Sequence, residues 1–170
     1  MVKIYKAETG DMQTVHDMAQ VVFRHTYREI LSSEQMEYMM EMMYSMPNLH
    51  EQIIQGHHYY LAYEGDVPCG YVSVQHEGTG DDGAEVYHLH KIYVMPDCQD
   101  AGVGKALFNT VLDHVRTASS GKRARIELNV NKYNRAVGFY EHLGMKIIHE
   151  EDYPIGNGFY KTDYIMGLDL

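Results

Sequence analysis

Residues 88–105 read HLHKIYVMPDCQDAGVGK, and this stretch decides how the rest of the chain is interpreted. A β-rich run ends at Val94, Pro96 interrupts it, and Gly102 and Gly104 lead into an amphipathic helix predicted over residues 102–118. Glycines let a backbone approach an anion closely, and the N–H groups at the start of a helix hold that anion with the helix dipole behind them. The stretch therefore predicts a phosphate-binding turn between a strand and a helix.

Three kinds of phosphate-binding loop compete for this turn. A P-loop would need glycine where Gln99 stands, and Ser or Thr where Ala106 follows Lys105. A dinucleotide-binding fingerprint would need glycine or alanine where Leu107 stands. The pattern that remains is Gln-x-x-Gly-x-Gly, which runs from Gln99 to Gly104.

The sequence on both sides of the turn alternates between strand and helix patterns. Strands are predicted over residues 2–8, 58–63, 70–75, 85–94, 124–130, 145–151 and 159–168. Helices are predicted over residues 11–27, 33–46, 49–55, 102–118 and 132–143. The order is βααββ and then βαβαββ, with the short helix at 49–55 as an addition, which indicates one α/β domain covering residues 1–170.

Local signals mark where these elements begin and end. Asp11 is expected to cap the first helix, and Ser32 or Ser33 the second. The tripeptide 64–66, Glu-Gly-Asp, predicts a hairpin turn, and residues 77–83, rich in Gly and Asp, predict a flexible loop.

Composition and charge exclude several classes of protein. Apolar residues make up 45% of the chain, and Lys plus Arg (14) against Asp plus Glu (24) gives a net charge of −10. That sign is wrong for a general nucleic-acid binder, and it suits solubility or a small cationic ligand. Cys69 and Cys98 lie far apart in the sequence with no CxxC, so a reduced, cytoplasmic protein is expected. No apolar run approaches the ~20 residues of a membrane span, and the histidines lack metal-ligand spacing, so neither membrane nor metal binding is predicted.

A second motif lies in residues 134–145, NRAVGFYEHLGM. Together with the Gln-x-x-Gly-x-Gly turn it resembles the GNAT N-acetyltransferase superfamily, whose helix reads Asn-x-x-Ala-x-x-Phe-Tyr-x-x-x-Gly-Phe. Here Ala136 stands one position early and Met145 replaces Phe. The resemblance covers nearly the whole chain, and its specific motifs lie between residues 86 and 145. It implies the GNAT acyl-CoA N-acyltransferase fold, in which a mixed central sheet carries helices on both faces.

The resemblance also implies an enzyme that transfers acetyl from acetyl-CoA to a primary amine by direct attack in a ternary complex. The strands that end at Val94 and near Val130 should splay apart and leave a slot for the pantetheine arm. Backbone groups of Ile92, Tyr93 and Val94 should bond that arm and the acetyl carbonyl. Asn134 should bond the arm or cap the helix start.

The pyrophosphate should lie on backbone N–H groups of Gln99, Asp100, Ala101, Gly102, Val103, Gly104 and Lys105. Lys105 adds a charge-assisted contact or remains solvated. Asp100 and Ala101 depart from the family, where Gly, Lys or Arg is common, and Asp100 is expected to point outward.

Tyr140 stands where family members place a general acid toward the sulfur of CoA, and the alternative is a tyrosine that packs in the core. A phenol whose ordinary pKa is near 10 can donate a proton at neutral pH. His88 and His90 are the candidate bases, and the alternative is a pair of solvated polar side chains. They share strand parity with Ile92, although a β-bulge could change which way they face.

Selectivity for the acceptor should come from residues 23–46 and the C-terminal hairpin. Tyr27, Glu29 and Tyr38 offer carboxylate and aromatic walls that suit an alkyl cation. A loose similarity to bacterial polyamine acetyltransferases indicates a small amine such as a polyamine, and a peptide or protein amine is the alternative. The glutamates of residues 34–41 are interpreted as a solvated helix face opposite a core stripe of methionines.

A different class stays open, a non-catalytic module that binds CoA as a sensor. The intact Tyr140 argues against it, because such a module needs no proton donor. The apolar strands near the C-terminus are compatible with a homodimer.

Overall fold

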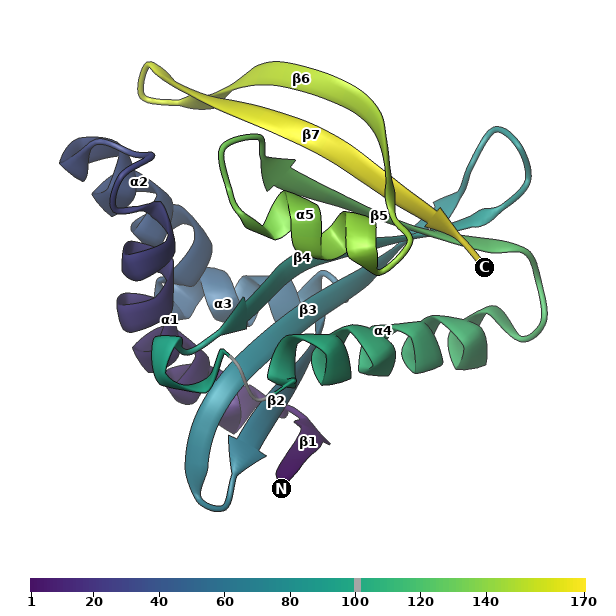
Figure 1. Ribbon diagram of the computed structural model, residues 1–170, viewed down its shortest axis with the longest axis horizontal. Helices are drawn as coiled ribbons and strands as arrows, with labels where there is room; N and C mark the ends of the chain where they lie inside the picture. Colours follow the sequence, from purple (N-terminus) through teal and green to yellow (C-terminus); the bar gives the residue numbers. More distant parts are fainter. Residues whose placement is uncertain (100–101) are drawn as a thin grey trace.

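A seven-stranded sheet forms the centre of the computed structural model, which describes residues 1–99 and 102–170 (Figure 1). Its strands lie in the order β1-β2-β3-β4-β5-β7-β6. Their bounds are β1 (Val2–Lys6), β2 (His58–Glu64), β3 (Val67–Thr79), β4 (Glu85–Val94), β5 (Ala124–Asn131), β6 (Lys146–Gly156) and β7 (Phe159–Asp169). Neighbouring strands are antiparallel except β4 and β5, which are parallel, so the predicted mixed sheet is confirmed.

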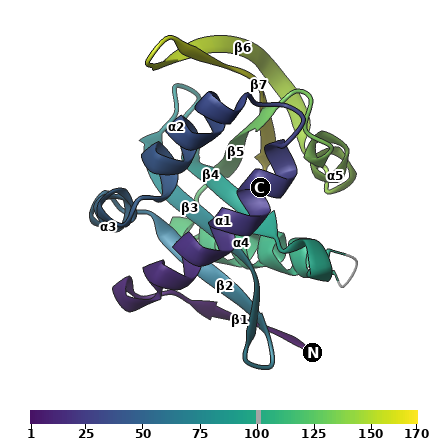
Figure 2. The same cartoon turned by 90° about the vertical axis from the view of Figure 1, so that its left-hand side faces the viewer.

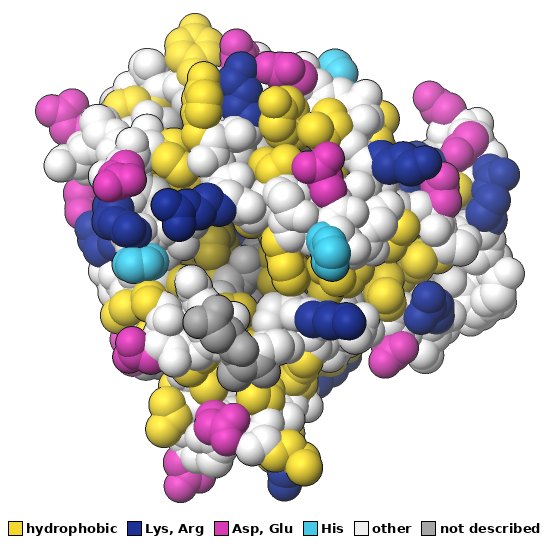
Figure 3. Space-filling view, in the orientation of Figure 1, with side chains coloured by type: hydrophobic (Ala, Val, Ile, Leu, Met, Phe, Trp, Pro, Cys, Tyr) yellow, Lys and Arg dark blue, Asp and Glu magenta, His cyan; other side chains and the backbone are white. Residues whose placement is uncertain are grey.

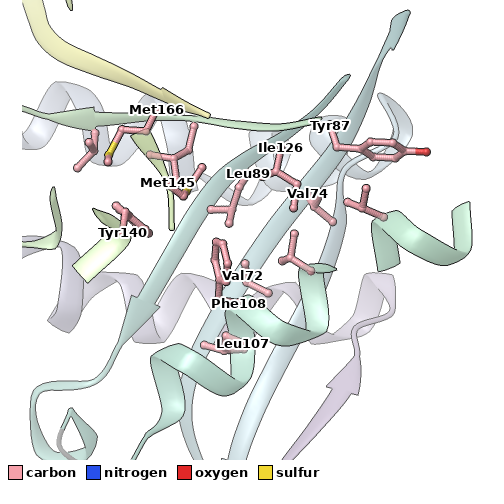
Figure 4. Packing of buried hydrophobic residues seen from close by; sticks show 14 of the residues in the cluster. Val72, Val74, Tyr87, Leu89, Leu107, Phe108, Ile126, Tyr140, Met145 and Met166 are labelled. Carbon is pink, nitrogen blue, oxygen red and sulfur yellow. The ribbon is translucent and has the colours of Figure 1, made fainter. Parts of the chain in front are cut away.

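Helices cover both faces of the sheet (Figures 1 and 2). On one face lie α1 (Met12–Tyr27), α2 (Ser33–Tyr44) and α3 (Met46–Ile54), and on the other lie α4 (Val103–Ser119) and α5 (Ala136–His142). Each face has its own buried core. Phe108 and Tyr140 belong to the α4–α5 core (Figure 4), whereas Phe23, Met39 and Tyr71 belong to the core under α1, α2 and α3. The prediction of an α/β fold with helices on both faces is confirmed.

Two helix starts show which capping predictions hold. Ser32 caps α2, because its Oγ accepts a hydrogen bond from Gln35 N–H at 3.1 Å. The prediction for Asp11 was wrong. Its carboxylate accepts from the backbone N–H of Glu8 at 2.8 Å and closes the 3-10 turn Thr9–Asp11 that precedes α1, so it gives α1 no side-chain cap.

Two of the boundaries that differ from the sequence prediction bear on the site. The expected loop at 77–83 is wrong in its first part, because β3 continues to Thr79 and pairs with β4. A register shift between His76 and Gly78, with φ +103° at the glycine, accommodates this extension. The helix expected from residue 132 begins at Ala136, because the side chains of Asn131 and Asn134 bond backbone N–H groups two residues ahead and form turns first.

The strands β4 and β5 separate before they end. Their parallel pairing runs from Glu85 with Ala124 to Leu89 with Leu128, and no pair follows among the described residues of either strand. On its other edge β4 remains paired with β3 up to Val94. The expected splay of these two strands is confirmed, and it leaves one edge of β4 without a neighbouring strand.

A substitution at Gly70 tests how closely β3 and β4 pack. A Cβ atom at Gly70 would lie 2.7 Å from the backbone oxygen of Tyr93, whereas a Cβ at Gly138 in α5 meets nothing within 4 Å. We expect Gly70→Ala to lower the free energy of unfolding by about 1–3 kcal/mol, because backbone has to move. The matched control, Gly138→Ala, should leave it unchanged or raise it by up to about 1 kcal/mol. Urea unfolding of both variants measures the difference, and equal stabilities would contradict the close approach of β3 to β4.

Candidate active site

The free edge of β4 presents backbone groups to the gap beside β5. Met95 N–H donates to Cys69 O of β3 at 2.7 Å, so the peptide groups at this position point toward β3. Backbone groups alternate in direction along a strand, which turns those of Ile92 and Val94 toward the gap. One of them is already engaged, because Gln99 Nε2 donates to Val94 O at 3.3 Å. The backbone groups of Tyr93 point the other way, toward β3, and its ring packs with the α1–α3 core.

The N-terminus of α4 follows directly after this edge. Gly102 has φ +74°, and the first helical hydrogen bond runs from Ala106 N–H to Gly102 O at 3.1 Å. The N–H groups of Val103, Gly104 and Lys105 precede this bond, and they have no hydrogen-bond partner among residues 1–99 and 102–170, so they suit an anion. Asp100 and Ala101, which belong to the predicted pyrophosphate site, lie outside the described residues.

The surroundings of this helix start favour an anion. The first turn of α4, which lies wholly within the described part of the chain, carries no acidic side chain, and Lys105 is exposed there. The space-filling view shows a hollow near the centre of this face, with Lys or Arg side chains on both sides of it (Figure 3).

Tyr140 and Asn134 come to the site from the α5 segment. Tyr140 is 5% exposed within the α4–α5 core, and burial, followed by the proximity of Tyr27, raises the pKa of its hydroxyl, so it keeps its proton. Asn134 Oδ1 accepts from Ala136 N–H at 2.9 Å, and its Nδ2 donates to Tyr27 Oη at 3.3 Å. Asn134 thus shapes the turn before α5 and links it to α1.

A cavity lies on the α1–α3 side of the gap. It is bordered by β4 through Tyr93, by β5 through Asn129 and Asn131, and by β7 through Lys161 and Asp163. The complete lining consists of Phe23, Tyr27, Leu31, Gln35, Met39, Met43, His90, Tyr93, Asn129, Asn131, Lys161 and Asp163. The cavity therefore joins residues from both of the diverging strands.

A β-bulge decides where His90 and its neighbours face. Val74 pairs with Leu89 and Ser73 with Lys91, which makes His90 the extra residue. Leu89 packs in the α4–α5 core, whereas Lys91 Nζ contacts Met43 O of α2 at 3.0 Å on the opposite face.

The bulge changes which residues of the strand share a face. Ile92 packs against the α4–α5 core, whereas His90 lines the cavity on the other face. Of the two alternatives that the sequence left open, the β-bulge holds: His88 and His90 lie together, and Ile92 turns to the other face. The extra residue shifts the alternation by one position.

Hydrogen bonds fix the state of His90. Gln75 Nε2 donates to the carbonyl of Gln55 at 2.9 Å, so Gln75 Oε1 faces His90 Nε2 at 2.8 Å and accepts a hydrogen bond from its N–H. The lone pair then belongs to Nδ1. Burial, then the neighbouring imidazoles of His88 and His57, lowers the pKa of His90 to about 2, which keeps the ring neutral.

His88 lies next to His90 but outside the lining of the cavity. The two rings are 4.4 Å apart, and His88 Nδ1 is 3.3 Å from Glu77 Oε1. Glu77 was assigned to a loop from the sequence, and only the extension of β3 places its carboxylate beside His88.

The three residues predicted for the acceptor have different positions. Tyr27 lines the cavity, and burial raises the pKa of its hydroxyl. Glu29 is exposed and does not line the cavity. Tyr38 donates to Ile155 O at 2.8 Å and packs on Phe159, so it connects α2 to the β6–β7 hairpin instead of lining the cavity.

Sequence reasoning missed the contributions of β5 and β7. It pointed to the C-terminal hairpin in general, but named neither Lys161 nor Asp163. Pairing of Asn131 with Asp163 brings these side chains to the gap, and the register between β5 and β7 is not visible in either segment alone.

Metal-binding clusters and membrane-spanning helices are both absent from residues 1–99 and 102–170. These ranges contain no group of three or more His, Cys, Asp or Glu side chains arranged to hold a metal ion. None of their helices is long and apolar enough to span a bilayer.

Comparison with solved structures shows the same fold. The PaiA N-acetyltransferase from Thermoplasma acidophilum, in complex with coenzyme A, superposes with a TM-score of 0.79 and 20% identity over 100% of this chain and 99% of that chain. A GCN5-related N-acetyltransferase from Rhodopseudomonas palustris superposes with a TM-score of 0.77 and 17% identity over 99% of this chain and 95% of that chain. Arabidopsis thaliana Naa50, in complex with the bisubstrate analogue CoA-Ac-MVNAL, superposes with a TM-score of 0.66 and 18% identity over 99% of both chains.

The sequence also matches a family directly. Residues 22–145 match the family described as "Acetyltransferase (GNAT) family", and this range includes the turn at Gly102, the free edge of β4 and the α5 motif. The resemblance seen in residues 86–145 is thereby confirmed. The chain is an acetyltransferase that belongs to the GNAT family.

Proposed function

We propose that this chain transfers the acetyl group of acetyl-CoA to the primary amine of a small molecule by direct attack within a ternary complex. The observation that carries the proposal is the gap between β4 and β5. The start of α4 lies at one side of it, and the cavity lined by Tyr93, Asn129 and Asn131 borders it on the other.

The residues around the gap fit acetyl-CoA, which supplies an activated acetyl thioester when bound. The backbone groups of Ile92 and Val94 face the gap and suit the amides of the pantetheine arm. The N–H groups of Val103, Gly104 and Lys105 suit the pyrophosphate, and the positive end of the helix dipole adds to the attraction. Asn134, held by Ala136 and Tyr27, stands at the start of α5 beside this path.

Two side chains are suited to manage protons on either side of the thioester. Tyr140 keeps its proton because it is buried, so its hydroxyl can donate to the sulfur that leaves. His90 is neutral, and its Nδ1 lone pair can accept a hydrogen bond from the amine in the cavity. His88 and Glu77 lie beside His90 outside the cavity, and the proton that the amine loses passes to water.

Charge reversal at the start of α4 tests cofactor binding. Acetyl-CoA should raise the Tm of the wild type by mass action on the folded state. Lys105→Glu places a carboxylate in the first turn, and we expect the Kd for acetyl-CoA to rise about tenfold. The control Arg116→Glu changes the net charge equally in the last turn of the same helix and should keep the wild-type shift. Thermal-shift titration measures both, and equal shifts would place the pyrophosphate elsewhere.

Removal of one hydroxyl tests the chemistry. We expect Tyr140→Phe to lower kcat by about 10²–10⁴, because positioned general-acid help is typically of that size. The Kd for acetyl-CoA should change little, because the lost interaction matters most as charge develops on sulfur.

Steady-state release of CoA with an amine acceptor measures kcat, and single-turnover rates show whether chemistry limits it. Tyr5→Phe removes a hydroxyl from an exposed tyrosine of β1 and is the control. Full kcat in Tyr140→Phe, with chemistry limiting, would make Tyr140 a packing residue and contradict the proposed mechanism.

A further inference from the structure

One oxygen atom of the cavity lining lacks a partner. In the ranges 1–99 and 102–170, Asp163 Oδ1 is the single buried side-chain oxygen or nitrogen without a hydrogen bond. Asp163 is 1% exposed, and it lines the cavity between α1, α2 and the ends of β4 and β5. A carboxylate oxygen that is buried without a partner is costly, so a native site that keeps one needs an explanation.

The other oxygen of Asp163 is held firmly. Its Oδ2 accepts from Tyr153 Oη at 3.1 Å and lies 3.3 Å from Lys161 Nζ. Asn129 Nδ2 in turn donates to Tyr153 Oη at 2.8 Å. Burial by itself would lower the pKa of Lys161, but Asp163 and Tyr153 together outweigh it, and the pKa is raised. These contacts fix the carboxylate and leave Oδ1 as the atom that can take a donor from a ligand.

Asp163 lies close to the gap between β4 and β5. Asp163 pairs with Asn131, the last residue of β5, at the end where β5 has already separated from β4. Tyr93 and His90 of β4 line the same cavity. A hydrogen-bond donor bound at Oδ1 would thus lie beside the gap between β4 and β5, where an acetyl thioester would be bound.

We propose, on the basis of the proposed function, that Asp163 Oδ1 receives the amino group of the acceptor, and that the acceptor is a primary amine with one cationic group on an apolar chain. The cavity supplies the surface for such a chain, because Phe23, Leu31, Met39 and Met43 line it.

The charge of the cavity argues against a polycation. Among the described lining residues Asp163 is the single carboxylate, and Lys161 stands beside it. A second ammonium group on the acceptor would face Lys161 without a carboxylate of its own. The glutamates of α2 do not line the cavity; Glu34, Glu37 and Glu41 are all exposed.

A conservative variant tests the role of this oxygen. Asp163→Asn keeps the size of the side chain and removes its charge, and Asp169→Asn makes the same change at an exposed position of the same strand. With n-hexylamine as the acceptor, we expect the KM of Asp163→Asn to rise about 10- to 100-fold, because a hydrogen bond to a charged group is lost. Asp169→Asn should keep the wild-type KM. The Tm shift caused by acetyl-CoA should be the same in all three proteins.

The outcomes separate this inference from the function on which it rests. If the wild type acetylates n-hexylamine and both variants share its KM, the role of Asp163 is overturned while the proposed function stands. If the wild type binds acetyl-CoA but acetylates no amine, the proposed function itself fails. A raised KM in Asp163→Asn that appears together with a lost acetyl-CoA shift would show a general distortion and would also overturn the specific role.

A second measurement needs no variant and stays informative if Asp163→Asn does not fold. The wild type is assayed with n-hexylamine and 1,6-diaminohexane, which have the same chain length and differ in one amino group. We expect kcat/KM to be at least about tenfold higher for the monoamine, because the diamine brings its second charge toward Lys161. A kcat/KM that is equal or higher for the diamine would overturn the single-charge acceptor.

Discussion

The early end of pairing between β4 and β5 is the constraint on which the candidate site depends. Beyond Leu89 and Leu128 the two strands share no pair, so the last residues of β4 have a backbone edge that needs other partners. The bulge at His90 coincides with this point and strengthens the local twist of β4, which turns the strand away from β5. The bulge and the end of pairing therefore lie together beside the gap, and His90 lines the cavity there.

Packing on both faces holds the diverging strands apart. Leu107 and Phe108 of α4 belong to the core beneath β3, β4 and β5, and the second core holds Tyr71 and Tyr93 against α1. Lys91 of β4 adds hydrogen bonds to this packing. The residue is 4% exposed, and its ammonium group donates to Met43 O, Gln52 Oε1 and Tyr59 Oη. Burial lowers the pKa of Lys91, and these acceptors offset the loss of water around its charge. The end of β4 is thereby fixed to α2, α3 and β2.

The electrostatics of the site differ on the two sides of the gap. The start of α4 offers the N–H groups that precede its first helical bond and the side chain of Lys105, which suit a phosphate, although the whole chain carries a net charge of −10. On the cavity side Lys161 balances Asp163, and the remaining polar groups are neutral. Burial raises the pKa values of Tyr27, Tyr93 and Tyr140, so these hydroxyls keep their protons and can donate hydrogen bonds.

The order of strand and helix patterns along the chain predicted the fold class. The turn before α4 and Tyr140 as a candidate could be found from the sequence because each depends on the spacing of residues within one short segment. It also predicted α4 and β4 closely, since their apolar patterns are local. The bulge at His90 and the position of Asp163 depend on tertiary packing. The bulge at His90 results from how β3 and β4 align, and Asp163 reaches the cavity only through the register of β7 on β5. Strand register is set by packing between segments that are far apart in the chain, so no local pattern around Asp163 could show that its carboxylate oxygen would face a cavity beside the opening between β4 and β5.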